Sequence, residues 1–130
     1  MDGEAIAVYR AMWKDAAEAS LTSDPKSPRL ADHAEGGALG LLQYMMEQIR
    51  DKGATSRGEA SVAPTVVKST KNKVELRDCV DGSKWVQVKP DHPSDGTPGG
   101  HYRTEASVVL SSGKWKVSEL SWGEAGSCMN

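Results

Sequence analysis

The chain has 130 residues, close to the commonest size of a single domain and long enough for one hydrophobic core. Its 16 Lys and Arg residues nearly balance its 18 Asp and Glu residues without forming blocks, so the basic face that nucleic acid binding requires is not expected. No run approaches the roughly 18 apolar residues of a membrane-spanning helix. The opening MDGEAIAVYRAMW is acidic where a secretory leader is basic, so we expect either a cytoplasmic protein or a chain whose removed leader Met1 replaces.

Helices are predicted in the N-terminal part, where small and apolar side chains recur at helical spacing. Between residues 4 and 21 they return every three or four positions, which indicates an amphipathic helix with Asp15 on its solvated face. A Ser-Pro pair then predicts a short helix over residues 28–33. A third helix is expected over residues 36–52, with Gly53 as its C-terminal stop.

Strands are predicted beyond the helices, where the hydrophobic period changes from 3.6 to 2. Residues 59–69 hold a proline inside a valine-rich run, so this segment is expected to form an edge or bulged strand. Residues 73–80 alternate between apolar and polar side chains, which is typical of a half-buried strand. The Asp81-Gly82 pair then predicts a hairpin turn into a strand over residues 84–89.

The C-terminal part predicts a loop, a hairpin and a tail. Residues 90–100, PDHPSDGTPGG, concentrate proline, glycine and aspartate and are expected to form a loop without regular structure. Residues 101–110 and 114–122 are predicted to be the two arms of a hairpin.

These elements predict one domain over residues 1–130. Its helices occupy about residues 4–53, its sheet about residues 56–123, and a short tail residues 124–130. Because the helices come first and an antiparallel sheet follows, the expected fold class is α+β, with N-terminal helices packed on the sheet.

The two cysteines, Cys79 and Cys128, allow only one intramolecular pairing, which would close a loop of about 50 residues. By the chain-entropy model this closure stabilises the fold by about 4 kcal/mol. It would also pin the C-terminal tail across the sheet. Without the bond, Cys79 is a small apolar residue of a strand. No zinc or other metal site is predicted, because there are only two thiols and no histidine near either in the sequence.

Five stretches, which together make up most of the chain, are similar to those of a known fold family. They are AVYRAMWKDAAEAS, TSDPKSPRLADHAEGGAL, RDCVDGSKW, HYRTEASVVL and GKWKVSELSWGEAGSC. With them the chain resembles the nuclear transport factor two-like superfamily, which includes ketosteroid isomerases and polyketide cyclases of the SnoaL type. The resemblance implies a cone-shaped, cystatin-like fold in which a curved sheet wraps around the helices.

More narrowly, the chain resembles small secreted or lipid-anchored proteins of high-GC Gram-positive bacteria. In such proteins the strand cysteine and the terminal cysteine are expected to pair. The resemblance therefore implies an extracytoplasmic location and allows a lipid anchor in a longer form of the chain, while a cytoplasmic location stays open.

The implied cone leaves a pocket between the concave sheet face and the first and third helices. The residues predicted to line it are aromatic or long and flexible: Tyr9, Trp13, Tyr44, Met45, Trp85, Tyr102 and Trp115. For Tyr9, Tyr44 and above all the tryptophans the plainer interpretation is core packing, because the chain has no phenylalanine, and for Tyr102 it is an ordinary residue at a strand end. A ligand of such a pocket is expected to be apolar or a flat ring.

An isomerase or cyclase would need a proton-transferring group and an oxyanion partner in this pocket. The catalytic candidates are Asp32 and His101, and the wider set of titratable residues adds Asp15, His33, Tyr44, Tyr102 and Glu119. Asp32 and His33 are neighbours on a short helix and point about 100° apart, so they are not expected to converge on one ligand atom. No phosphate-binding loop or nucleophile motif occurs, and no cofactor is predicted.

Three functional hypotheses follow. The leading one is a non-enzymatic extracytoplasmic domain that binds a small apolar ligand or a protein partner. The second is an isomerase or cyclase acting on an apolar substrate in the cone. The third is a structural or dimerising module, for which polar strand residues such as Glu75, Arg77, Arg103 and Glu105 would suit a wet interface between two copies.

Overall fold

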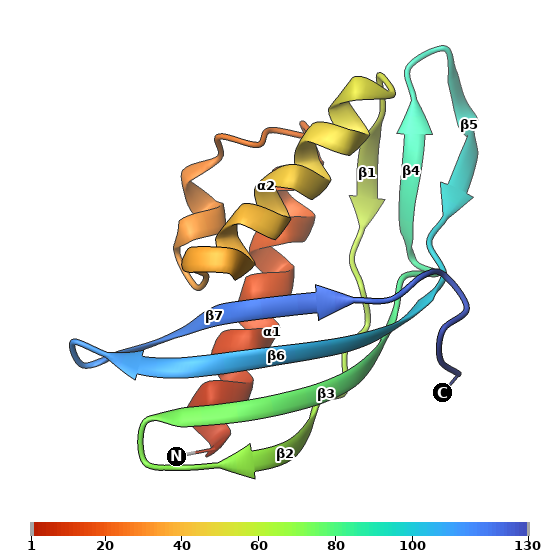
Figure 1. The fold of residues 1–130 in the computed structure, drawn as a ribbon. Coiled ribbons are helices and arrows are strands. Elements are labelled where there is room, and N and C mark those ends of the chain that lie inside the picture. Colours follow the sequence, from red (N-terminus) through yellow and green to blue (C-terminus); the bar gives the residue numbers. More distant parts are fainter. Residues whose placement is uncertain (1, 130) are drawn as a thin grey trace.

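A computed structural model gives the fold of residues 2–129, with only the backbone described at residues 92–95. The helices are α1 (Asp2–Ser20), the 3-10 helix η1 (Pro28–Ala31) and α2 (Gly36–Asp51). The strands are β1 (Thr55–Gly58), β2 (Thr65–Ser69), β3 (Lys73–Asp81), β4 (Trp85–Lys89), β5 (His92–Pro98), β6 (His101–Ser111) and β7 (Lys114–Trp122). Figure 1 shows the helices on one side of strands that curve around them. The predicted α+β class is confirmed.

The helices begin and end within two residues of their predicted bounds. Acidic Asp2 and Glu4 lie in the first turn of α1, where negative charge offsets the positive end of the helix dipole. The Ser27 hydroxyl accepts a hydrogen bond from the Arg29 N–H at 3.3 Å and so caps η1, with Pro28 as its first residue. Local sequence chemistry therefore fixes these helix starts.

The strands form two antiparallel sheets with the orders β2-β3-β6-β7 and β1-β4-β5. Two stretches of chain run from one sheet into the other, β3 into β4 and β5 into β6, and they stay paired at the junction. The Gly82 N–H donates to the Gly100 carbonyl at 2.8 Å, and the Gly99 N–H donates to the Gly82 carbonyl at 3.0 Å. The two sheets are therefore the two ends of one bent ribbon, which Figure 1 shows bending where β3 meets β4.

The predicted hairpin at Asp81-Gly82 is wrong. A turn does form there, with the Trp85 N–H bonded to the Gly82 carbonyl at 3.0 Å, but it bends the chain without reversing it. Strand β4 consequently pairs with β1 and β5 and not with β3. The bend needs glycine, because a methyl group added at Gly99 would lie 2.8 Å from the Gly82 carbonyl oxygen.

The predicted loop over residues 90–100 is also wrong, because β5 runs through it and pairs with β4. The reversal of direction lies between these two strands, at Pro90 and Asp91. Strand β5 is at the edge of the three-stranded sheet, so its backbone needs a partner on one side only. Proline and glycine are tolerated at such an edge, and composition alone therefore misled the prediction.

The first two strands also differ from the expectation. Within residues 59–69, β2 begins only at Thr65, and the earlier part is attached by a single bridge between Ser61 and Asp81. The register of β2 shifts between Val66 and Lys68, as expected of a bulged strand. Strand β1, with the sequence TSRG, has no apolar alternation that could have indicated it.

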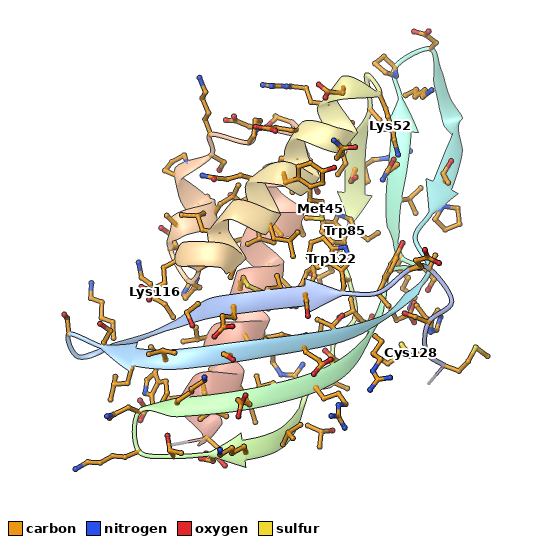
Figure 2. The ribbon with its side chains drawn as sticks, in the orientation of Figure 1. Met45, Lys52, Trp85, Lys116, Trp122 and Cys128 are labelled. Carbon is orange, nitrogen blue, oxygen red and sulfur yellow. A yellow bond between two sulfur atoms is a disulfide. The ribbon has the colours of Figure 1, made fainter. Side chains whose placement is uncertain are left out.

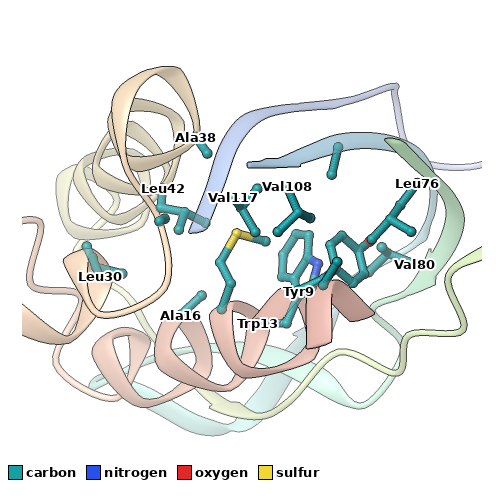
Figure 3. Close-up of a cluster of buried hydrophobic side chains, with 14 of the residues drawn as sticks. Tyr9, Trp13, Ala16, Leu30, Ala38, Leu42, Leu76, Val80, Val108 and Val117 are labelled. Atoms are coloured by element: carbon teal, nitrogen blue, oxygen red, sulfur yellow. The ribbon is translucent and has the colours of Figure 1, made fainter. Parts of the chain in front are cut away.

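The core lies between the two helices and the concave face of the four-stranded sheet. Strand β3 alternates as predicted, with Val74, Leu76 and Val80 buried. All three belong to one cluster with Tyr9 and Trp13 of α1, and Figure 3 shows Leu76 and Val80 on the same side of this cluster as Tyr9. Helix α2 contributes its own buried stripe, Ala38, Leu42, Met46 and Ile49. The helical and strand periodicities thus converge on one cluster.

A disulfide joins Cys79 of β3 to Cys128 of the tail, with the two Cα atoms 5.9 Å apart. The tail also bonds to β6: the Arg103 N–H donates to the Ser127 hydroxyl at 2.8 Å, and the Gly126 N–H donates to the His101 carbonyl at 2.9 Å. The tail is thus held along the start of β6, beside the bend of the ribbon (Figures 1 and 2).

Over residues 2–129, no helix combines the length and the apolar character that crossing a membrane demands.

Replacing both cysteines by alanine is expected to lower the free energy of unfolding by about 4 kcal/mol, because the closed loop spans 49 residues. Urea unfolding of the double variant and of the unreduced protein measures this difference. Two free thiols, titrated in denaturant without reductant in the original protein, would contradict the bond itself.

Candidate functional site

A cavity of about 200 Å³ lies where α1 and α2 meet the bent ribbon. Its lining residues come from both helices and from both sheets: Trp13, Met45, Ile49, Ser56, Val80, Gly82, Trp85, Gln87, Gly99, Tyr102, Thr104 and Trp122. We call it the tryptophan cavity. Figure 2 shows Met45, Trp85 and Trp122 close together between α2 and the strands. These three side chains are half-buried, so this side of the cavity meets the solvent.

Three indole rings form much of the cavity wall. Trp13 is 5% exposed and stands at their centre, with its ring centroid 6.0 Å from that of Trp85 and 5.9 Å from that of Trp122. The ring planes of Trp13 and Trp85 meet at 88°, the edge-to-face arrangement that aromatic quadrupoles favour. The Trp85 indole N–H donates to the Ser20 hydroxyl at 2.9 Å, which fixes its orientation.

The polar part of the lining is neutral. Ser56, Gln87, Tyr102 and Thr104 supply its hydroxyl and amide groups. The Tyr102 hydroxyl accepts a hydrogen bond from the Gly100 N–H at 3.0 Å, and the Thr104 hydroxyl donates to the Tyr102 carbonyl at 2.9 Å. Among the residues whose side chains the structure describes, no Asp, Glu, Lys, Arg or His lines the cavity. The wall therefore offers hydrogen bonds and aromatic surface without charge.

The structure brings four of the seven predicted pocket residues, Trp13, Met45, Trp85 and Tyr102, to this cavity. Their role in binding stays a prediction. Tyr9 is buried in the core beside Trp13, and Trp115 lies at the opposite end of β7 from Trp122.

Tyr44 does not face the sheet, and that expectation is wrong. Its side chain is 56% exposed. Leu42 belongs to the buried stripe of α2. Tyr44 follows it by two positions, a rotation of roughly 200° around the helix, and therefore points away from the sheet.

The lining residues that the sequence did not indicate come from two sources. Ser56 and Gln87 line the cavity because β1 pairs with β4, and no local sequence pattern predicts that pairing. Trp122 ends β7, and Thr104 follows Tyr102 on the same face of β6. Because side chains two positions apart on a strand share a face, Thr104 could have been predicted to line the cavity together with Tyr102.

The two catalytic candidates lie outside the cavity. Asp32 is exposed at the end of η1, with a carboxylate oxygen 3.7 Å from Arg29. His101 precedes Tyr102 on β6, so it points to the opposite face, where its Nε2 is 3.5 Å from an Asp81 oxygen. Hydrogen bonds from Ser83 hold the pKa of Asp81 below its ordinary value, with a smaller contribution from His101.

Another acidic residue, Asp15 of α1, also forms a pair with a histidine. His33 Nδ1 lies 2.6 Å from Asp15 Oδ2, and Asp15 is only 7% exposed. The expectation that Asp15 lies on the solvated face of α1 is therefore wrong, because the segment carrying His33 covers it. Burial raises the pKa of Asp15, and the hydrogen bond from His33 opposes this shift.

A buried carboxylate that the sequence reasoning missed is Asp78. It is 7% exposed and accepts hydrogen bonds from the Tyr9 hydroxyl at 2.9 Å and from the Ala63 N–H at 3.1 Å. Burial, together with the charge of Asp78, raises the pKa of Tyr9 far above its usual range. Asp78 lies on the same face of β3 as Leu76 and Val80, so the alternation of this strand could have predicted its burial.

No family profile matches the chain, and no curated protein matches its sequence. Solved structures do share its fold. The intermembrane space region of the chloroplast protein ARC6 superposes with a TM-score of 0.61 at 13% identity, over 92% of this chain and 93% of that one.

Two cystatin-like proteins of Nostoc punctiforme, both of unknown function, are similar as well. One, described as a domain, gives a TM-score of 0.57 at 12% identity over 89% of this chain and 74% of its own. The other gives 0.55 at 11% identity over 97% and 91%. At such identities the likeness shows a cystatin-like fold alone.

Replacing Tyr9 by phenylalanine removes one of the two donors to buried Asp78. The free energy of unfolding is expected to fall by about 1–3 kcal/mol, the cost of leaving a buried polar group unsatisfied. The matched control is Tyr44→Phe, whose exposed hydroxyl should be worth less than about 0.5 kcal/mol. Equal losses in the two variants, measured by urea unfolding, would contradict the role of the hydrogen bond.

Because the folded-state pKa of Asp15 is raised from 3.8, folding favours its protonated form. This contribution to stability is complete at low pH and is lost as the pH rises through the raised value. Relative to an Asp15→Asn variant, whose side chain does not ionise, the original protein should therefore become less stable as the pH rises above about 4. Urea unfolding of both proteins between about pH 3.5 and 6 tests the sign. A difference that grows in the other direction would refute it.

Proposed function

We propose that this domain is a non-enzymatic, extracytoplasmic binding protein that holds one small ring-shaped molecule in the tryptophan cavity. The observation that carries the proposal is the convergence of Trp13, Trp85 and Trp122 on one cavity with a neutral lining. Indole rings offer flat, polarizable surface, which suits a flat partner.

The size of the cavity limits the ligand. Pockets for drug-sized molecules measure about 300–1,000 Å³, whereas this one holds about 200 Å³. An apolar cavity of about 150 Å³ is known to take up benzene. The space inside the tryptophan cavity therefore suits a single ring with a short substituent, and a steroid or a polyketide would extend out of it.

Two further features support this function over the alternatives. An isomerase or cyclase would place a proton carrier at its substrate, and Asp32 and His101 both lie elsewhere. The Cys79–Cys128 disulfide suits an oxidising compartment, which favours an extracytoplasmic location. Binding of a protein partner and pairing of two copies remain hypotheses with no observation of their own.

Toluene is the simplest probe of the proposed site. We expect it to bind with a dissociation constant of about 1 mM or below, which requires only about 4 kcal/mol. A Met45→Trp variant, which fills the cavity from α2, should abolish binding in isothermal titration calorimetry. Tyr44→Trp adds the same ring one position away on the exposed face and should leave binding unchanged. Toluene that fails to bind the original protein, or binds both variants equally, would refute the site.

A further inference from the structure

We infer that the ligand carries an uncharged amide-like group, recognised by Gln87 and Ser56 of the three-stranded sheet. The inference rests on the proposed function and names the chemistry of its ligand: a single ring with a carboxamide, or with a lactam edge in which an N–H and a C=O lie side by side.

Ser56 and Gln87 form a polar pair by position. They are direct partners in the register of β1 and β4, and residues directly opposite each other in an antiparallel pair project from the same face. Both line the tryptophan cavity. The pair therefore presents one hydroxyl and one amide to the cavity that the indole of Trp13 also lines.

Neither side chain has a protein partner within the part of the chain that the structure describes. Ser56 is 2% exposed and Gln87 is half-buried, and neither polar group is sealed off from the cavity that both residues line. Their hydrogen-bonding capacity is therefore left for whatever occupies the cavity, water or a ligand. A ligand group that completes these bonds can replace that water.

Some other polar groups of the lining are already engaged, although the buried indole N–H of Trp13 has no hydrogen-bond partner among the described residues. The Trp85 N–H is bonded to Ser20, and the Thr104 hydroxyl donates its proton to the Tyr102 carbonyl. The Tyr102 hydroxyl accepts from Gly100 and keeps one proton to donate. Within the described lining, Trp13 and Tyr102 can only add donors, whereas Ser56 and Gln87 offer donors and acceptors side by side.

The chemistry of glutamine selects the complementary group. Its amide places a donor and an acceptor next to each other, the arrangement with which Gln binds the donor–acceptor edge of adenine in two hydrogen bonds. A carboxamide or lactam presents the same edge. A carboxylate presents two acceptors, and no charged side chain described at the cavity wall would neutralise it. The neutral amide is therefore favoured over the acid.

The test compares three ligands of one ring each, benzamide, toluene and benzoate, by isothermal titration calorimetry. Benzamide is expected to bind at least about tenfold more tightly than either of the others. Toluene leaves Ser56 and Gln87 unpaired, and benzoate adds an uncompensated charge. Benzamide that binds no better than toluene would overturn this inference and leave the proposed function intact. If none of the three binds, both fail.

Gln87→Leu is expected to remove the advantage of benzamide over toluene, with toluene bound as well as before or better. Ser56→Ala should reduce that advantage by about threefold. If Gln87→Leu does not fold, this second variant alone tests the role of the pair. Gln43→Leu, on the exposed face of α2, is the matched control and should change neither affinity. Benzamide that keeps its full advantage in both Gln87→Leu and Ser56→Ala would overturn the role of this pair.

Discussion

The backbone contact between Gly82 and Gly99 is the constraint on which the rest of the structure depends. Two strands cross from one sheet to the other at this point, and they remain hydrogen-bonded because no side chain separates them. A straight ribbon would leave β4 beyond the reach of α2. The bend turns β4 back beside β1, so Trp85 meets Trp13 and the tryptophan cavity forms in the angle. The next residue, Gly100, has no room for a side chain either, because an added methyl group would lie 2.8 Å from the Ala125 side chain of the tail.

The carboxylates that the structure describes near the tryptophan cavity do not line it. Asp78 is buried in the core next to the cavity wall, but Tyr9 and the Ala63 N–H satisfy its oxygens. Asp15 is paired with His33 away from the cavity, and Asp81 lies on the outer face of the ribbon. These three acidic groups are thus bonded within the protein and do not line the tryptophan cavity.

Sequence reasoning succeeded where structure is decided locally and failed where it is decided by distant pairing. The helices and β3 show their periods within a few residues, so their buried apolar stripes could be predicted, whereas the burial of Asp15 and Asp78 and the exposure of Tyr44 were not predicted. Strand β1 has only four residues and gains its stability from β4. Strand β5 resembles a loop in composition because an edge strand tolerates proline. The Ser56–Gln87 pair depends on β1 and β4, and was therefore beyond the reach of the sequence.

The grouping of the tryptophans has an optical consequence. The ring centroids of Trp85 and Trp122 each lie about 6 Å from that of Trp13, close enough for excitation energy to pass to and from Trp13. Their shared ultraviolet emission therefore arises at the cavity wall and responds to whatever occupies the cavity. Trp115, at the far end of β7, emits from outside this group and serves as an internal reference. The protein thus carries an unlabelled spectroscopic reporter of the tryptophan cavity.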